Sequence, residues 1–226
     1  MNLKRAFDIL ASLVGIIIFF PIMIFTGILI KITSKGSILF RQRRLTLNMK
    51  EFTIYKFRSM RTDFDKTGKG IQVKGSSNAI TPVGKFIRKT KFDELPQLFN
   101  ILKGDMSFIG PRPELPRRLQ YYSQDDKRVF TVRSGVSSPA SIVFSDEEYL
   151  MEQVADPEKF YIEQIMPYKI QLNLYYIDNR NFKYDLYLIL ATFLKIIGFL
   201  KINSVVEDKE LLEKKEELVG KIGVDY

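Results

Sequence analysis

A long uncharged run near the start of the chain constrains the fold more than any other feature. From Ile9 to Ile30 the sequence reads ILASLVGIIIFFPIMIFTGILI, without a charged residue. A helix of about 20 apolar residues crosses the hydrocarbon core of a bilayer, so the run predicts a membrane-embedded helix. A cleaved signal peptide fits less well, because the stretch is too long and no A-x-A-type cleavage site follows it.

The course of this helix depends on a proline and on the flanking charges. Pro21 lies in mid-run, where a proline removes a backbone hydrogen bond and kinks or breaks a helix. Cytoplasmic flanks carry the excess of positive charge, and here both flanks are basic: Lys4, Arg5, Lys31, Lys35, Arg41, Arg43 and Arg44. The two features favour a re-entrant helix broken at Phe20-Pro21, with a plain single-pass helix as the alternative. Asp8 lies three residues after Arg5, so we expect the two to pair at the membrane interface.

Missing residue types limit the chemistry. The 226 residues include no histidine and no cysteine, which excludes disulfides, a thiolate nucleophile, an imidazole base and an ordinary structural zinc site. Catalysis would rely on carboxylates, lysine, arginine, tyrosine, hydroxyls or a hard metal ion. The formal net charge of +9 suits anionic lipid or phosphorylated molecules. Nucleic acid is not expected, because the basic residues form no recognised binding motif.

The rest of the chain predicts an α+β, mostly helical protein. Ile38–Phe40 and Phe52–Tyr55 read as strands of a small β-hairpin around a turn near Asn48. One helix begins at Thr81-Pro82 and ends near Thr90, because proline suits the first helical turn. A second, with apolar residues at three- and four-residue spacing, begins near Asp93 and ends before Gly104.

We divide the chain into a membrane-embedded helix (1–35), a cytoplasmic domain (36–204) and a charged tail (205–226). The polar, glycine-rich stretch 63–77 predicts a mobile loop. The apolar stretch 187–202, interrupted by Lys195 and Lys201, is typical of an amphipathic helix at a membrane surface. The tail is predicted to be a solvated helix.

Asp93-Glu94 is the first candidate for chemistry. An aspartate at a helix N-cap is favoured by the dipole and by free backbone N–H groups, which also attract phosphate. A carboxylate can act as a nucleophile toward a phosphoryl group when cations let the two anions approach. Taken alone, the pair is more typical of an ordinary helix start.

Basic residues nearby could neutralise that charge. Arg112 lies between Pro111 and Pro113, and a rigid loop lowers the entropy lost when a guanidinium holds phosphate. Lys56 and Arg58 share one face of the second strand. Arg88, near the end of the preceding helix, is a further candidate, and Arg133 is a weaker one. Each could instead be an incidental surface charge, whereas carboxylates among several cations are what phosphoryl transfer needs, usually with Mg²⁺.

From about Lys4 to Ile197 the chain resembles the bacterial sugar transferases, specifically the small monotopic phosphoglycosyl transferases. The resemblance rests on four ordered blocks: KRAFD (4–8), GSILFRQRR (36–44), FTIYKFRSM (52–60) and KFIRKTKFDELPQLFNILKGDMSFIGPRPELP (85–116). Two departures stand out. The helix break, often Ser-Pro in the family, is Phe20-Pro21, and the common Arg-Pro-Gly segment reads Arg133-Ser134-Gly135.

The resemblance implies a mechanism. Asp93 would attack the β-phosphate of a UDP-sugar and release UMP, and polyprenyl phosphate would then take the phosphosugar from the carboxylate. Glu94 would assist, and Mg²⁺ would bind at Asp93. The phosphates or nucleotide would be held by Lys56, Arg58, Arg88 and Arg112, in a loop shaped by Pro111 and Pro113.

The implied enzyme lies at the cytoplasmic face of the bacterial inner membrane and starts a lipid-linked glycan such as a capsule, exopolysaccharide, O-antigen or glycoprotein glycan. Its partners would be a UDP-sugar, polyprenyl phosphate and membrane lipids, with downstream glycosyltransferases and a second copy of the chain as further candidates. The rival hypothesis is a non-catalytic membrane adaptor whose basic face binds anionic lipid or a partner enzyme.

Overall fold

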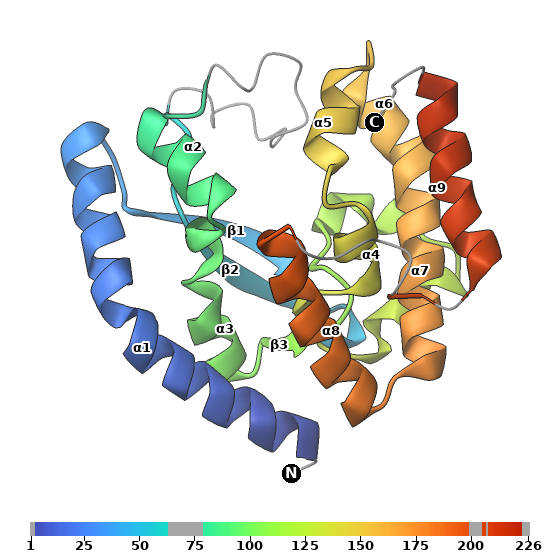
Figure 1. The fold of residues 1–226 in the computed structure, drawn as a ribbon, viewed down its shortest axis with the longest axis horizontal. Coiled ribbons are helices and arrows are strands. Elements are labelled where there is room, and N and C mark those ends of the chain that lie inside the picture. Colours follow the sequence, from blue (N-terminus) through green and yellow to red (C-terminus); the bar gives the residue numbers. More distant parts are fainter. Residues whose placement is uncertain (1–2, 63–78, 199–204, 207, 223–226) are drawn as a thin grey trace.

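The computed structural model describes residues 3–62, 79–198, 205–206 and 208–222, so the predicted loop at 63–77 lies outside the described residues. Helices dominate, as predicted (Figure 1). The helices are α1 (Leu3–Thr33), α2 (Pro82–Lys89), α3 (Gln97–Lys103), α4 (Pro139–Val143), α5 (Glu147–Glu152), α6 (Pro157–Phe160), α7 (Met166–Asn179), α8 (Phe182–Ile196) and α9 (Lys209–Ile222). The strands are β1 (Leu39–Leu45), β2 (Glu51–Phe57), β3 (Met106–Ile109) and β4 (Ser134–Ser137).

Helix α1 continues through Pro21. Figure 1 shows that its axis is curved, and the helix is not interrupted at the predicted break, Phe20-Pro21. Within the described part of the chain, α1 is the helix long and apolar enough to cross a membrane, and only 22% of its most apolar window is buried. An apolar face this exposed calls for a non-aqueous neighbour. Whether the helix is re-entrant stays a prediction.

The predicted hairpin is confirmed. Strands β1 and β2 pair antiparallel, with Arg41 opposite Tyr55 and Phe40 opposite Lys56. Asn48 and Met49 in the connecting turn adopt left-handed backbone angles, φ 55° and 58°, and asparagine tolerates this conformation better than most residues. One edge of the hairpin reaches the rest of the body, because the Leu45 N–H donates to the Glu114 carbonyl over 2.8 Å.

Helix α2 begins as predicted, but α3 does not. Thr81 caps α2, its hydroxyl accepting the Gly84 N–H over 2.9 Å. Lys91 then takes a left-handed conformation (φ 58°) and starts the 3-10 turn η4 (Phe92–Glu94). Helix α3 begins only at Gln97, and Pro96 occupies its N-cap position, where the missing N–H costs no intrahelical hydrogen bond. The expectation that Asp93 lies at a helix N-cap is therefore wrong.

Strands β3 and β4 form a parallel pair that the sequence patterns did not predict. Their close approach depends on two glycines. A Cβ on Gly135 would lie 2.1 Å from the Gly110 nitrogen, and one on Gly110 would lie 2.3 Å from the Arg133 carbonyl. Only glycine at these two positions lets the backbones approach so closely. This close backbone packing positions the loop after β3, which carries Arg112.

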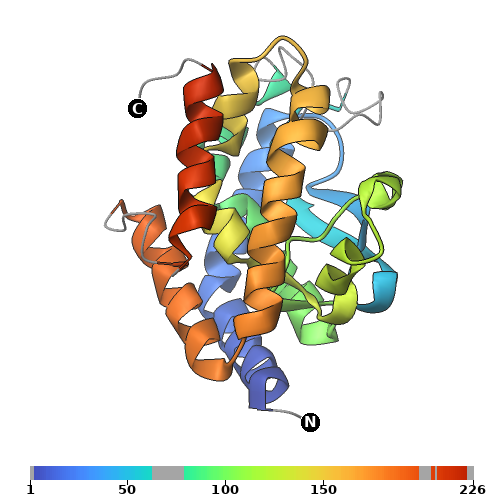
Figure 2. The same cartoon turned by 90° about the vertical axis from the view of Figure 1, so that its right-hand side faces the viewer.

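The main core surrounds α7, whose Leu172 and Tyr176 are almost wholly buried. Helix α8 begins at Phe182, earlier than the predicted interfacial helix, and leaves Leu190 and Phe193 exposed on one side. Helix α9 runs beside α7 (Figure 2). Its helical form is confirmed, but it is not a fully solvated tail, because Lys215 is buried and bonds the Val143 carbonyl over 2.7 Å.

Candidate active site

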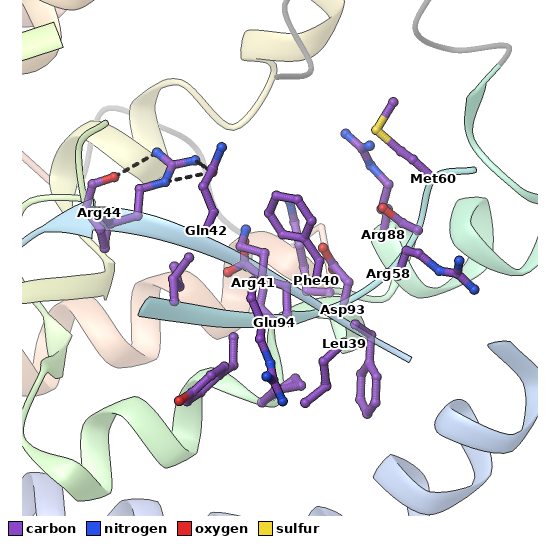
Figure 3. Close-up of a pocket in the computed structure, with 18 of the residues that line it drawn as sticks. Leu39, Phe40, Arg41, Gln42, Arg44, Arg58, Met60, Arg88, Asp93 and Glu94 are labelled. Atoms are coloured by element: carbon purple, nitrogen blue, oxygen red, sulfur yellow. Dashed lines mark hydrogen bonds and ion pairs between the residues drawn. The ribbon is translucent and has the colours of Figure 1, made fainter. Parts of the chain in front are cut away.

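A cavity of about 1580 Å³ brings the hairpin, the η4 turn, the loop after β3 and the α5–α7 region together around Asp93 and Glu94. In Figure 3, Asp93 and Glu94 lie near the hairpin, with Arg88 and Arg58 on one side and Arg44 on the other. The predicted catalytic residues and most of the predicted phosphate-binding residues therefore line one cavity.

Glu94 is held by two cations. Lys56 Nζ lies 2.7 Å from its Oε1 and Arg112 Nη2 lies 3.0 Å from the same atom. Burial by itself would raise the pKa of Glu94, but the charges of Lys56 and Arg112 outweigh it and hold that pKa well below the usual range. Glu94 is therefore a fixed anion that positions both cations beside Asp93.

Asp93 has a different environment, although it is the next residue. Its Oδ1 is buried and has no hydrogen-bond partner. Burial, followed by the negative charge of Glu94, raises the pKa of Asp93, while Lys56, Lys91 and Arg88 act in the opposite direction. A desolvated carboxylate oxygen with no partner is expensive to maintain in a fold, and such atoms are concentrated at functional sites.

Arg88, at the last turn of α2, presents a matching feature on the cationic side. One of its guanidinium nitrogens pairs with Glu148 of α5, but Nη1 is buried without a partner. Burial lowers the pKa of Arg88, and the charge of Asp93 partly offsets that effect. The cavity thus holds an unsatisfied oxygen of Asp93 and an unsatisfied guanidinium donor of Arg88.

The proline-framed loop places Arg112 as the sequence suggested. Pro111 accepts the Gly135 N–H over 2.9 Å through its carbonyl, and Pro113 accepts a bond from Arg44 Nη1 over 3.0 Å. Arg112 and Pro113 line the cavity, whereas Pro111 does not. Arg44 was not predicted as a site residue. Burial lowers the pKa of Arg44 to about 10, and its guanidinium also bonds Gln42.

Arg58 lines the cavity, yet its donors point to the end of α1. Nη2 bonds the Ser34 carbonyl over 3.0 Å and the Ser34 hydroxyl over 2.8 Å, and Nη1 bonds the Lys35 carbonyl. Cations suit the carbonyl-rich C-terminus of a helix. Nε alone is buried without a partner. The structure therefore assigns most of this guanidinium to anchoring α1.

Arg133 lies outside the main cavity, and its Nε donates to the Gly104 carbonyl over 2.8 Å.

The first turns of α1 are tied to the protein body. Lys4 Nζ lies 2.6 Å from Asp185 Oδ2, Arg5 bonds the Ile101 and Leu102 carbonyls, and Asp8 accepts from the Ser107 hydroxyl and the Phe108 N–H. Their predicted place at a membrane interface is not tested by these contacts.

Sequence reasoning missed the α5–α7 side of the cavity. Lys169 pairs with Glu147 over 2.5 Å, and Arg118 lies over the Tyr161 ring, 4.1 Å from its centroid. Asn173 lies one turn after Lys169 on α7 and also lines the cavity. The four-residue spacing of Lys169 and Asn173 shows that they share a helix face. No sequence pattern connects that face with Asp93.

Mg²⁺ takes oxygen ligands. Among the described residues no group of three or more acidic side chains could hold a metal ion. Mg²⁺ is commonly bound by one or two carboxylates together with substrate phosphates and water. The unpartnered Oδ1 of Asp93 fits that mode, whereas Glu94 Oε1 is already shared by Lys56 and Arg112.

The known proteins that the chain resembles in sequence include several named as sugar transferases or sugar phosphotransferases. The chain is 38% identical over 204 residues to a UDP-N-acetylgalactosamine-undecaprenyl-phosphate N-acetylgalactosaminephosphotransferase of Aeromonas hydrophila; the match covers 87% of this chain and 44% of that protein. It is 42% identical over 122 residues to a UDP-glucose:undecaprenyl-phosphate glucose-1-phosphate transferase of Klebsiella pneumoniae, covering 54% of this chain and 26% of that protein.

The chain thus spans less than half the length of those two relatives. A third, the uncharacterized sugar transferase EpsL of Bacillus subtilis, is 32% identical over 212 residues, which are 92% of this chain and 96% of that protein. The family model described as bacterial sugar transferase matches residues 1–198. With the predicted motifs gathered around one cavity, the chain belongs to the bacterial sugar transferase family.

Proposed function

We propose that the protein transfers a phosphosugar from a UDP-sugar to polyprenyl phosphate, forming polyprenyl-diphospho-sugar and UMP. The observation that carries the proposal is the cavity itself. It presents a desolvated, unpartnered Asp93 oxygen beside a fixed anion–cation cluster of Glu94, Lys56 and Arg112. The names of the relatives support undecaprenyl phosphate as the acceptor.

In the first step an Asp93 oxygen attacks the β-phosphorus of the donor. A new carboxylate O–P bond forms, the bond from the β-phosphorus to the bridging oxygen breaks, and UMP leaves with that electron pair. Arg88 Nη1, buried and unsatisfied, would donate a hydrogen bond to a phosphate oxygen. Lys56 and Arg112 would balance the charge that accumulates near the carboxylate pair.

In the second step a phosphate oxygen of the polyprenyl acceptor attacks the phosphorus of the enzyme-bound phosphosugar. The O–P bond to the acceptor forms while the bond to Asp93 breaks, which regenerates the carboxylate. Glu94 holds Lys56 and Arg112 in place during both steps. Mg²⁺, held by Asp93 and the donor diphosphate, would supply further charge neutralisation when bound.

The other wall of the cavity suits the lipid substrate. Apart from Gly27 and Lys31, near the C-terminal end of the helix, the α1 residues that line the cavity are apolar and include Phe20, Met23, Ile24 and Ile28. Their continuity with the exposed apolar side of α1 supports delivery of an isoprenoid phosphate from the bilayer. We place the catalytic domain on the cytoplasmic face of the bacterial inner membrane, since both flanks of the apolar run are basic. The reaction would start a lipid-linked glycan.

The purified full chain, incubated with Mg²⁺, a panel of UDP-sugars and undecaprenyl phosphate, should release UMP. Asp93→Asn should lower the rate by about 10⁴-fold or more, because the nucleophile is lost. A radiolabelled donor supplied without acceptor should label the wild type and not the Asp93→Asn variant. Wild-type protein that is inactive with every donor, as the rival adaptor hypothesis expects, or an active Asp93→Asn variant, would refute the proposal.

A further inference from the structure

The α5–α7 side of the cavity has no part in the mechanism so far. We refer to Glu147, Tyr161, Lys169 and Asn173 as the α7 wall; all four line the cavity. Each is largely enclosed, with Tyr161 5% exposed and Asn173 8% exposed. The α7 wall faces a space shared with Asp93, and its polar side chains contrast with the apolar α1 side.

Asn173 has a buried amide oxygen, Oδ1, without a hydrogen-bond partner. Buried amide oxygens in folded proteins are normally bonded, and leaving one unsatisfied destabilises the fold. An acceptor of this kind, on a residue that lines a substrate cavity, can be satisfied by a hydroxyl or amide N–H of a ligand. It is thus a binding group for a neutral polar part of a substrate.

The backbone at this wall is also unusual. Between α6 and α7 the chain forms a π-helical turn, Tyr161–Ile165. Such turns are rare and occur often at functional sites. Arg118 and Lys169 both lie over the Tyr161 ring, at 4.1 and 5.4 Å from its centroid. Because cations occupy these positions over the ring, Tyr161 is poorly suited to stack on a nucleobase.

Two ion pairs line the cavity, one at Glu94 and one on the α7 wall. Glu94 pairs with Arg112 over 3.0 Å, and Glu147 pairs with Lys169 over 2.5 Å. The charges of Arg112 and Glu147 act on each other between these pairs. Asn173 lies one turn beyond Lys169 on α7 and lines the same cavity.

We infer that the α7 wall is the subsite for the donor's sugar, with Asn173 as the residue that reads a ring hydroxyl or an N-acetyl group. This inference rests on the proposed function. It follows from the division of the cavity, whose apolar α1 side suits the lipid and whose Lys56, Arg88 and Arg112 suit the phosphates. A neutral hydrogen-bonding sugar matches the unsatisfied acceptor that remains.

Binding and turnover together test the inference. Asn173→Leu keeps the side-chain size but loses the amide, and Asn173→Ala removes the side chain beyond Cβ. With detergent-solubilised full chain, both should lower kcat/KM for the preferred donor by about five- to tenfold. The preference among UDP-N-acetylglucosamine, UDP-N-acetylgalactosamine, UDP-glucose and UDP-galactose should shrink, while inhibition by UDP stays unchanged. Asn179→Ala, an exposed position on the same helix, should match the wild type.

Equilibrium binding to the Asp93→Asn protein separates this inference from the proposed function, since it needs no turnover. There, adding Asn173→Leu should weaken UDP-sugar binding and leave UDP binding unchanged. An equal loss of UDP and UDP-sugar affinity would place the uridine at the wall and overturn the inference. So would an unchanged donor ranking in active Asn173 variants with a wild-type Tm. Wild-type protein without turnover would contradict the proposed function instead.

Discussion

Basic side chains surround both ends of α3, but their partners differ. At the C-terminal end, Arg5 bonds the Ile101 and Leu102 carbonyls and Arg133 bonds the Gly104 carbonyl. The Ile101 carbonyl also accepts the Gly104 N–H over 3.0 Å. The last carbonyls of a helix lack the usual partner in the next turn, and cations are favoured there. Arg5 and Arg133 are referred to below as the C-terminal pair.

At the other end, the cations meet side-chain anions at the edge of a cavity. Lys56 and Arg112 share one oxygen of Glu94, and Arg88 keeps a buried Nη1 without a partner. These three residues are the N-terminal group. The difference teaches that a basic residue near a catalytic motif is not thereby a phosphate ligand. A basic residue can bind phosphate only if its N–H donors are not already hydrogen-bonded to backbone carbonyls.

The largest expected difference between the two groups is in catalysis. Arg112→Gln should lower kcat/KM for the UDP-sugar by about 10²–10³-fold, because a donor positioned for developing phosphate charge is lost. Arg133→Gln should stay within about threefold of the wild type. UMP release under identical conditions measures both. Equal losses of kcat/KM in the two variants would contradict the comparison and show that Arg133 acts in the catalytic site.

Stability should show the reverse order. Arg5→Met removes two hydrogen bonds from a charged donor to buried carbonyls, so we expect a loss of about 1.5–3 kcal/mol in unfolding free energy. Arg88→Met should change it by less than about 1 kcal/mol, since its ion pair involves the exposed Glu148 and an unsatisfied donor is removed. Thermal unfolding in detergent compares the two. A larger loss for Arg88→Met would contradict the assignment of roles.

The smallest expected effect is on the pH profile. Asp93 must be ionised to attack, so activity is lost as the pH falls through its pKa, which burial and Glu94 raise. Glu94→Gln removes the neighbouring negative charge and leaves Lys56 and Arg112 to stabilise the Asp93 anion. The acid limb of kcat/KM should therefore move to lower pH.

The residual activity of Glu94→Gln, followed by UMP release across the acid range, provides the measurement. Glu51→Gln is the matched control, because Glu51 pairs with Arg43 on the hairpin and does not line the cavity. Its acid limb should coincide with that of the wild type. An acid limb of Glu94→Gln that stays in place or moves to higher pH would show that Glu94 does not set the Asp93 charge.

Local patterns predicted local structure well. The hairpin followed from strand composition around Asn48, and α2 followed from Thr81-Pro82, because both depend on neighbours in the sequence. The start of α3 was placed too early, since the left-handed backbone of Lys91 and the 3-10 turn that it starts are not visible in a helical periodicity. The β3–β4 pair was missed because it joins segments separated by the loop and 3-10 turns between them.

The sequence by itself determined the long apolar character of α1, the exclusion of imidazole and thiol chemistry, and the family, because each depends on residue type or on order along the chain. Tertiary structure alone decided that Arg58 and Arg133 bond carbonyls while Arg112 bonds Glu94. It also decided that Lys169 and Asn173 line the same cavity as Asp93. These outcomes depend on which groups meet across the fold, and one-dimensional spacing carries no such information beyond a single helix or hairpin.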